Sequence, residues 1–175
     1  MNTQKITSLI RDVKDFPKEG IIFKDITPIL KKPAVCREIV SEFFKRFNRT
    51  TIDVIVGIES RGFLFGMLLA QKFKIPFVPV RKSGKLPYKT VAYKYDLEYG
   101  SAEIEIHADA IVKGQHILIH DDLLATGGTA SATAELVKML GGKIAGFSFL
   151  VELGFLNGRQ KLENYTDNVE CLIKY

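Results

Sequence analysis

The chain has 175 residues, a net charge of +5 and a pI near 9.1, and this length suits a single domain with a full hydrophobic core. Its 25 basic residues are interleaved with 20 acidic ones, which argues against nucleic acid as the main partner and suits a polyanionic small molecule equally well. No apolar run is long enough for a signal peptide or a membrane span, and Cys36 and Cys171 lack metal-site spacing, so we expect a cytoplasmic protein with reduced thiols and no membrane partner.

Apolar and amphipathic segments alternate along the chain. In chain order, the pattern predicts a helix over residues 33–47, a strand over 52–58, a helix over 62–73, strands over 75–80 and 116–121, a helix over 129–140, and strands over 143–152 and 168–175. Most of the strands are nearly continuous apolar runs, which is typical of a parallel sheet covered on both faces. The alternation predicts an α/β fold with a doubly wound, mainly parallel sheet.

The segment "RKSGKLPYKTVAYKYDLEYGS", residues 81–101, breaks this alternation. It is polar, basic and aromatic without a helical period, and at most a short exposed ribbon is expected within it. A structureless connection of this length is usually a lid or a binding loop. The alternative is an insertion without a role.

Two adjacent acids stand where a core strand meets a turn in "ILIHDDLLATGGTA", residues 117–130. Asp121 and Asp122 repel each other and need compensation if they are buried. The turn that follows, residues 125–129, combines glycines and hydroxyls before a helix, which favours a phosphate cradle. Carboxylates accept hydrogen bonds from sugar hydroxyls and hold Mg²⁺, so ribose and a metal would compensate them. Ordinary turn and cap residues are the alternative.

A second strand ends at small and polar residues in "VGIESRGFLFG", residues 56–66. The amides around Glu59, Ser60 and Arg61 would lie at a helix N-terminus, which suits a diphosphate; a helix cap with a surface arginine fits this stretch as well. Both candidate sites follow parallel strands, which places them on one rim of the sheet. Neither the G-x-x-x-x-G-K-[ST] nor the G-x-G-x-x-G phosphate motif is present.

The acid-pair segment resembles the phosphoribosyl-diphosphate motif of type I phosphoribosyltransferases. The resemblance extends over residues 6–175. It is to the adenine-specific members of the family, through the segments "FPKEGIIFKDITP", "GIESRGFLFG", "RKSGKLP" and "YDLEYGSAEIEIH". The resemblance implies one domain over residues 1–175 with a five-stranded parallel core, a hood from about residues 1–32 and a flexible loop over about 81–101. It also implies a homodimer that, with Mg²⁺, transfers the phosphoribosyl group from phosphoribosyl diphosphate to adenine, giving AMP and diphosphate in purine salvage.

The same resemblance assigns roles to individual residues. The 5-phosphate would lie on the turn at 125–129, the ribose hydroxyls and the metal on the acid pair, and the diphosphate on the turn at 59–61 and on loop cations. Main-chain atoms at Ile22 and Lys24 would read the adenine edge. The implied catalytic residues are Glu98, which would exchange a proton with the purine ring, Tyr99, Arg61 and Lys85. The implied binding residues are Ala125, Thr126, Gly127, Gly128, Thr129, Asp121, Asp122, Glu59, Ser60, Arg81, Lys82, Ile22, Phe23, Lys24 and Asp25.

Two alternatives stay open at this stage. One is a phosphoribosyltransferase that accepts a 6-oxopurine, and the other is a regulator of the same fold that senses phosphoribosyl diphosphate. The chain also departs from the family pattern at Tyr88-Lys89, where many relatives carry Gly-Pro or other pairs, and at His120, where a branched apolar residue is usual. The histidines, including His107 and His116, are expected to be structural.

Overall fold

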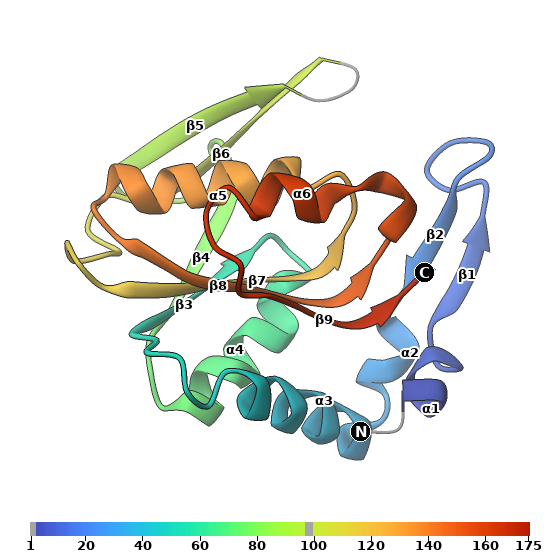
Figure 1. Cartoon of the computed structure of the whole chain (residues 1–175). Coiled ribbons are helices and arrows are strands. Elements are labelled where there is room, and N and C mark those ends of the chain that lie inside the picture. Colours follow the sequence, from blue (N-terminus) through green and yellow to red (C-terminus); the bar gives the residue numbers. More distant parts are fainter. Residues whose placement is uncertain (1–2, 97–99) are drawn as a thin grey trace.

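The computed structural model describes residues 3–96 and 100–175 (Figure 1). A seven-stranded sheet has the order β5-β6-β4-β3-β7-β8-β9. Five neighbouring strands of it run parallel, and they are β4 (Phe77–Lys82), β3 (Val54–Ile58), β7 (His116–Leu124), β8 (Lys143–Glu152) and β9 (Val169–Lys174). The predicted α/β fold with a mainly parallel sheet is therefore confirmed.

Helices cover both faces of this sheet because its central strands are apolar on both sides, and every residue of β3 is buried. One face packs on α5 (Gly128–Met139) and α6 (Gly158–Leu162), and a 3₁₀ turn, η1 (Gly154–Leu156), precedes α6. The other face packs on α3 (Pro33–Arg46) and α4 (Gly62–Phe73). Figure 1 shows these two layers on opposite sides of the sheet. In the described part of the chain, no helix has the length and apolar character needed to cross a membrane.

The connection after β4 differs from the expected structureless loop. β5 (Thr90–Asp96) and β6 (Ser101–His107) form a long antiparallel ribbon, and β6 pairs with β4 through Arg81 and Lys82. The physical reason is the alternation along β5, because Val91, Tyr93 and Tyr95 pack against the α5 side of the core while the residues between them face outward. The prediction of a segment without structure was wrong for residues 81–82 and 90–96, where the ribbon is longer than the short one allowed, whereas residues 83–89 form neither a helix nor a strand.

The N-terminal segment forms a small unit beside the end of β9. It contains α1 (Thr3–Thr7), β1 (Arg11–Lys14), β2 (Ile22–Asp25) and α2 (Thr27–Leu30), and β1 and β2 pair as a separate antiparallel sheet. Two ion pairs join β1 to β2: Arg11 Nη2 lies 2.6 Å from Asp25 Oδ2, and Lys24 Nζ lies 2.7 Å from Asp12 Oδ1. The Lys24 ammonium also lies 3.9 Å from the ring centre of Tyr175. The ribbon is thereby attached to the carboxyl edge of the sheet.

Candidate active site

The acid pair lies within β7 rather than at its end. Pairing with β8 continues past the acids through Leu123 and Leu124, whose apolar side chains extend the core strand, so the expectation that the strand stops at Asp121 was wrong. Asp122 is buried, and the Oδ1 atom of Asp121 accepts a hydrogen bond of 2.8 Å from the Asp122 amide.

The pKa values of both acids are raised. Burial, together with the charge of Asp122, raises the pKa of Asp121 well above its usual range. Burial also raises the pKa of Asp122, although the Arg61 guanidinium opposes this effect. The Oδ2 atom of Asp122 is buried and accepts no hydrogen bond within the described residues. Negative charge on the pair is thus disfavoured in the free protein, because the protein itself does not fully compensate it.

The glycine turn after β7 forms a small cavity. Gly127 adopts a left-handed φ of 76° as the residue before α5, so it leads the chain into the helix in a conformation that favours glycine. The cavity has a volume of about 80 Å³. It is lined by Asp121, Leu123, Leu124, Ala125, Thr126, Gly127, Gly128, Thr129, Ala130 and Phe149. The start of α5 therefore faces a hollow whose amides and hydroxyls suit a phosphate.

The turn at residues 59–61 lies next to the acid pair. A Cβ on Gly62 would lie 2.8 Å from the His120 carbonyl and 3.0 Å from Asp121 Oδ1, so only glycine permits this approach of α4 to β7. Arg61 places its Nε 3.2 Å from Asp122 Oδ2. Its guanidinium carbon lies 4.7 Å from the ring centre of Phe23, and its Nη1 is buried without a hydrogen-bond partner within the described residues. Arg61 therefore joins the acid pair to β2.

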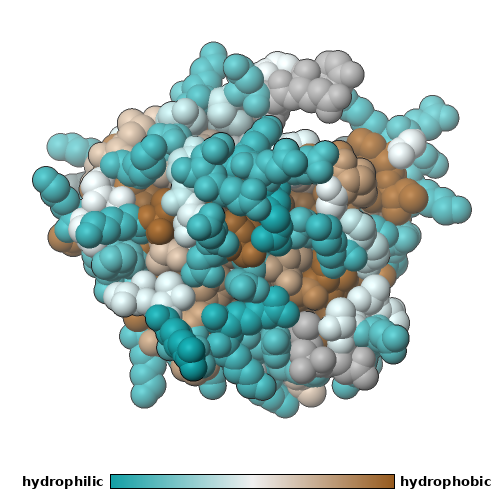
Figure 2. All heavy atoms as spheres, in the orientation of Figure 1, coloured by the Kyte–Doolittle hydropathy of each residue, from teal (hydrophilic) through white to brown (hydrophobic). Residues whose placement is uncertain are grey.

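The residues expected at the adenine differ in how their side chains are used. Phe23 lies beside Arg61. It also packs edge-to-face on Phe16, with the two ring centres 5.2 Å apart. The side chains of Lys24 and Asp25 are occupied by the ion pairs of the ribbon. Figure 2 shows a hydrophobic group at the upper right, where Figure 1 places the β1–β2 connection, and Phe16, Ile21 and Ile22 are 52%, 44% and 50% exposed. The ribbon thus presents an apolar tip.

Two acids hold the segment that carries the predicted loop cations. Arg81 Nε bonds Glu59 Oε2 at 3.0 Å, which brings two predicted diphosphate residues together. Glu105 accepts hydrogen bonds from the Lys85 and Leu86 amides and from the Thr90 hydroxyl, and it is 5% exposed. Burial alone would raise its pKa, but these donors outweigh burial and lower it. The side chains of Lys82 and Lys85 remain exposed, while the predicted catalytic residues Glu98 and Tyr99 lie outside the described residues.

Comparisons with known proteins agree with this arrangement. The family model described as "Phosphoribosyl transferase domain" matches residues 25–173. The chain belongs to the phosphoribosyltransferase family. The adenine phosphoribosyltransferase of Desulfitobacterium hafniense is 57% identical over 166 residues, which cover 95% of each chain, and that of Cytophaga hutchinsonii is 50% identical over 172 residues, which cover 98% of this chain and 95% of that protein.

Solved structures of adenine phosphoribosyltransferases have the same fold as this phosphoribosyltransferase. The enzyme of Thermoanaerobacter pseudethanolicus superposes with a TM-score of 0.96 at 48% identity and covers 99% of this chain and 100% of its own. The enzyme of Saccharomyces cerevisiae, solved with an imino-altritol bisphosphate and adenine, has a TM-score of 0.90 at 41% identity and covers 97% of both chains.

The acid pair fits the magnesium ion that this phosphoribosyltransferase is expected to use. Mg²⁺ prefers hard oxygen ligands and is usually held by one or two carboxylates together with substrate phosphates. Asp121 and Asp122 supply such oxygens beside the phosphate cavity, and Asp122 Oδ2 has no hydrogen-bond partner in the described structure. No group of three or more histidine, cysteine or acidic side chains able to hold a metal occurs among residues 3–96 and 100–175. The donor set is therefore one that substrate oxygens must complete.

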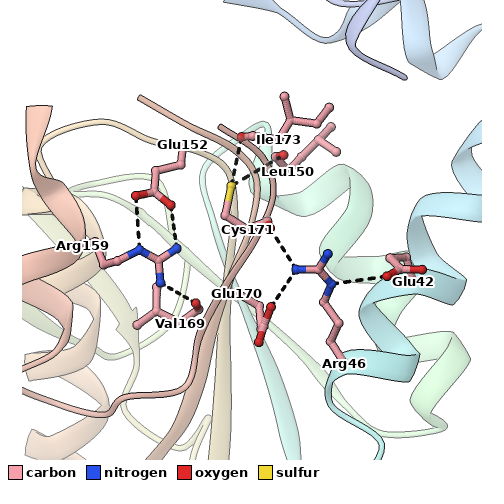
Figure 3. Close-up of polar contacts among 9 residues, drawn as sticks. All are labelled: Glu42, Arg46, Leu150, Glu152, Arg159, Val169, Glu170, Cys171 and Ile173. Carbon is pink, nitrogen blue, oxygen red and sulfur yellow. Dashed lines mark hydrogen bonds and ion pairs between the residues drawn. The ribbon is translucent and has the colours of Figure 1, made fainter. Parts of the chain in front are cut away.

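The support behind the glycine turn of this phosphoribosyltransferase was not predicted from the sequence. A Cβ on Gly127 would lie 2.6 Å from the Gly158 carbonyl, so the backbone of the turn touches the start of α6 directly. Figure 3 shows the neighbouring Arg159, which bonds both carboxylate oxygens of Glu152 at 3.2 and 2.6 Å and the Val169 carbonyl at 2.6 Å. These bonds tie α6 to β8 and β9. The Asn-Gly pair before Arg159 signals a turn, but it does not show which part of the chain this turn contacts.

Proposed function

We propose that the chain transfers the 5-phosphoribosyl group from phosphoribosyl diphosphate to adenine, giving AMP and diphosphate in purine salvage. The observation that carries the proposal is the acid pair of β7, in which Asp122 is buried and Asp121 lines the cavity, between the glycine turn and the Arg61 turn on one rim of the sheet. The relatives of about 50% identity over nearly the whole chain are adenine phosphoribosyltransferases, which supports adenine as the acceptor.

The geometry suggests how the chain binds the phosphoribosyl donor. The amides and hydroxyls of residues 125–129 bind the 5-phosphate, and the acid pair accepts hydrogen bonds from the ribose hydroxyls. The turn at residues 59–61 binds the diphosphate with Arg81, Lys82 and Lys85. Anchoring the donor at both ends fixes the C1′ atom between the diphosphate and the base.

Bond cleavage makes the ribose positive and the leaving diphosphate more negative. The carboxylates of Asp121 and Asp122 stabilise the positive ribose, and the guanidinium of Arg61 and the loop cations stabilise the diphosphate. Mg²⁺, held by the acid pair directly or through water, would supply a further positive charge at the diphosphate. Excluding water prevents hydrolysis of the ribosyl cation, and the segment at residues 81–101 is the proposed lid.

The hood proposed over about residues 1–32 holds the base. Main-chain groups at Ile22 and Lys24 read the adenine edge, and Phe23 contacts the purine ring beside Arg61. Glu98 exchanges a proton with the ring, and Tyr99 lies beside it in sequence.

Turnover with each purine base in turn tests this proposal. Adenine carries a C6 amino donor and an unprotonated N1, whereas hypoxanthine presents an acceptor and a donor at these positions. A penalty of about 1 to 3 kcal/mol for each of two mismatched groups predicts a preference for adenine in kcat/KM of roughly 10² to 10⁴. Hypoxanthine used within tenfold of adenine would instead support the 6-oxopurine alternative. Binding of phosphoribosyl diphosphate without AMP formation would support the regulator.

We also propose that two copies associate through the outer face of α4, in the cytoplasm. Leu64, Met67 and Leu68 are 41%, 57% and 37% exposed, and their spacing forms one apolar stripe. A cavity of about 690 Å³ between α3 and α4 adjoins the stripe at Leu68. Met67→Glu should convert the dimer into a monomer in sedimentation, whereas Met139→Glu, at a 56% exposed position on α5, should not. A monomeric parent protein at micromolar concentration would contradict the dimer.

A further inference from the structure

A tyrosine of the β5–β6 ribbon contacts the glycine turn. The hydroxyl of Tyr95 lies 3.0 Å from Oγ1 of Thr129, within hydrogen-bond distance, and the pair is partly buried. The Tyr95 ring lies 3.8 Å from the position that a Cβ of Gly128 would occupy, and it packs against the core on the α5 side. Because Thr129 lines the cavity of about 80 Å³, this contact reaches the proposed phosphate site from outside the turn.

The hydrogen-bonding capacity of the two hydroxyls determines what Tyr95 can do. Each hydroxyl has one proton to donate, and a phosphate oxygen only accepts. In the free protein either hydroxyl can be the donor. Once Thr129 donates its proton to a phosphate, Tyr95 must be the donor to Thr129 if their bond is to persist. A hydroxyl that accepts such a bond is polarised and becomes a better donor itself.

We propose that Tyr95 is a positioning residue for the 5-phosphate of phosphoribosyl diphosphate. It donates to Oγ1 of Thr129, which holds the Thr129 hydroxyl with its proton directed into the cavity. The proposal rests on the proposed function, because it requires a phosphate on residues 125–129.

Replacing Tyr95 by phenylalanine isolates the hydroxyl, since the ring and its packing are retained. We expect Tyr95→Phe to raise KM for phosphoribosyl diphosphate and Kd for ribose 5-phosphate by roughly 3- to 10-fold, the effect of one hydrogen bond. The kcat and the Kd of inorganic diphosphate should stay within twofold, because that ligand occupies the Arg61 turn. Tyr93→Phe is the matched control: Tyr93 packs against the same core cluster, and its hydroxyl makes no hydrogen bond to the described part of the chain.

Calorimetric titration of ribose 5-phosphate decides the outcome. Equal affinity in Tyr95→Phe and the parent protein would overturn the inference, as would an equal loss of diphosphate affinity, which would indicate general loosening. In a double-mutant cycle with Thr129→Ala, the two losses should be less than additive, and full additivity would also overturn it. A parent protein that binds no ribose 5-phosphate and makes no AMP would instead refute the proposed function.

Discussion

The Nε atom of Arg61 lies 3.2 Å from Oδ2 of Asp122, whose side chain is 2% exposed, while the guanidinium carbon of the same residue lies over the Phe23 ring. One side chain therefore contacts both the proposed ribose site on β7 and the proposed base site on β2. Without ligand, this cation opposes but does not cancel the effect of burial, which leaves the pKa of both acids raised. Ionisation of the acid pair is therefore unfavourable in the free protein, and a ligand that brings positive charge or hydrogen-bond donors would reduce this cost.

The first prediction concerns this acid pair. Asp121→Asn combined with Asp122→Asn should cost roughly 2 to 5 kcal/mol of transition-state stabilisation, measured as kcat/KM, because two charge-assisted interactions are lost.

The same pair affects stability. An acid whose pKa is raised by folding binds more protons in the folded state, so the parent protein loses stability as pH rises above about 4, the pKa of an unfolded aspartate. The double variant should therefore have a higher Tm than the parent at pH 7 in the absence of ligand. Asp167→Asn, at an exposed position, is the control, and near-normal turnover of the double variant would count against the ribose site.

The second prediction concerns the contact between the glycine turn and α6. A Cβ on Gly158 would overlap the carbonyl of Ala125 and lie 2.8 Å from the Gly127 amide nitrogen, and neither is the end of a flexible side chain. Gly158→Ala should therefore displace the turn and destabilise the protein by about 1 to 3 kcal/mol in denaturant unfolding. The affinity for ribose 5-phosphate should fall more than the affinity for inorganic diphosphate. The exposed Gln160→Ala, on the same helix, should change neither.

The third prediction concerns the ion pair behind α6. Hydrogen bonds from Arg159 lower the pKa of Glu152 despite burial, so the stabilisation is present above about pH 4.3, the pKa of an unfolded glutamate, and is lost as pH falls through the lower folded pKa. Glu152→Gln should destabilise the protein by about 1.5 to 3 kcal/mol at pH 7, and the difference from the parent should shrink in acid. Unfolding by urea at pH 7 and pH 3 measures both values. Glu170→Gln, which weakens the more exposed pair with Arg46, should cost less (Figure 3).

The fourth prediction concerns the turn after β4. Because Glu105 binds two amides of this turn, Glu105→Gln should speed tryptic cleavage after Lys82, Lys85 and Lys89. Glu103→Gln, at an exposed position on the same strand, should not. Phosphoribosyl diphosphate with Mg²⁺ should slow cleavage of the parent protein if the segment closes over ligand. Equal cleavage rates with and without ligand would argue against the proposed lid.

The fifth prediction concerns the β1–β2 ribbon, where the base is proposed to bind. The Lys24 ammonium is held by Asp12 and lies over Tyr175, so Lys24→Ala should lower Tm and weaken adenine binding modestly. The preference for adenine over hypoxanthine should persist, because backbone groups read the base. Ile22→Asp should reduce kcat/KM for adenine much more, since it places a charge against the purine. A reversed base preference in Lys24→Ala would show that its side chain reads the purine edge.

The central sheet was predictable because each of its strands is marked by a pattern within a short stretch of the sequence. The apolar runs of β3, β7, β8 and β9 and the glycines after α5 show the parallel core directly. The acid pair and the turn at residues 59–61 follow their strands in sequence, so the shared rim follows from topology. The Gly158 contact and the Tyr95–Thr129 bond join residues distant in sequence, and no local pattern shows that their elements meet. Only a short exposed ribbon was expected after β4, because the polar residues that alternate along β5 hide how far its apolar residues pack against the core.

The contact between Lys24 and Tyr175 has a consequence for biosynthesis. A ribosome releases the chain from its N-terminus, and the β1–β2 ribbon emerges well before β9 has been translated. The contact between Lys24 and Tyr175 can therefore form only after β9 has been translated. A nascent chain stalled before residue 169 could carry the acid pair and the glycine turn, yet it would lack the aromatic ring on which Lys24 rests.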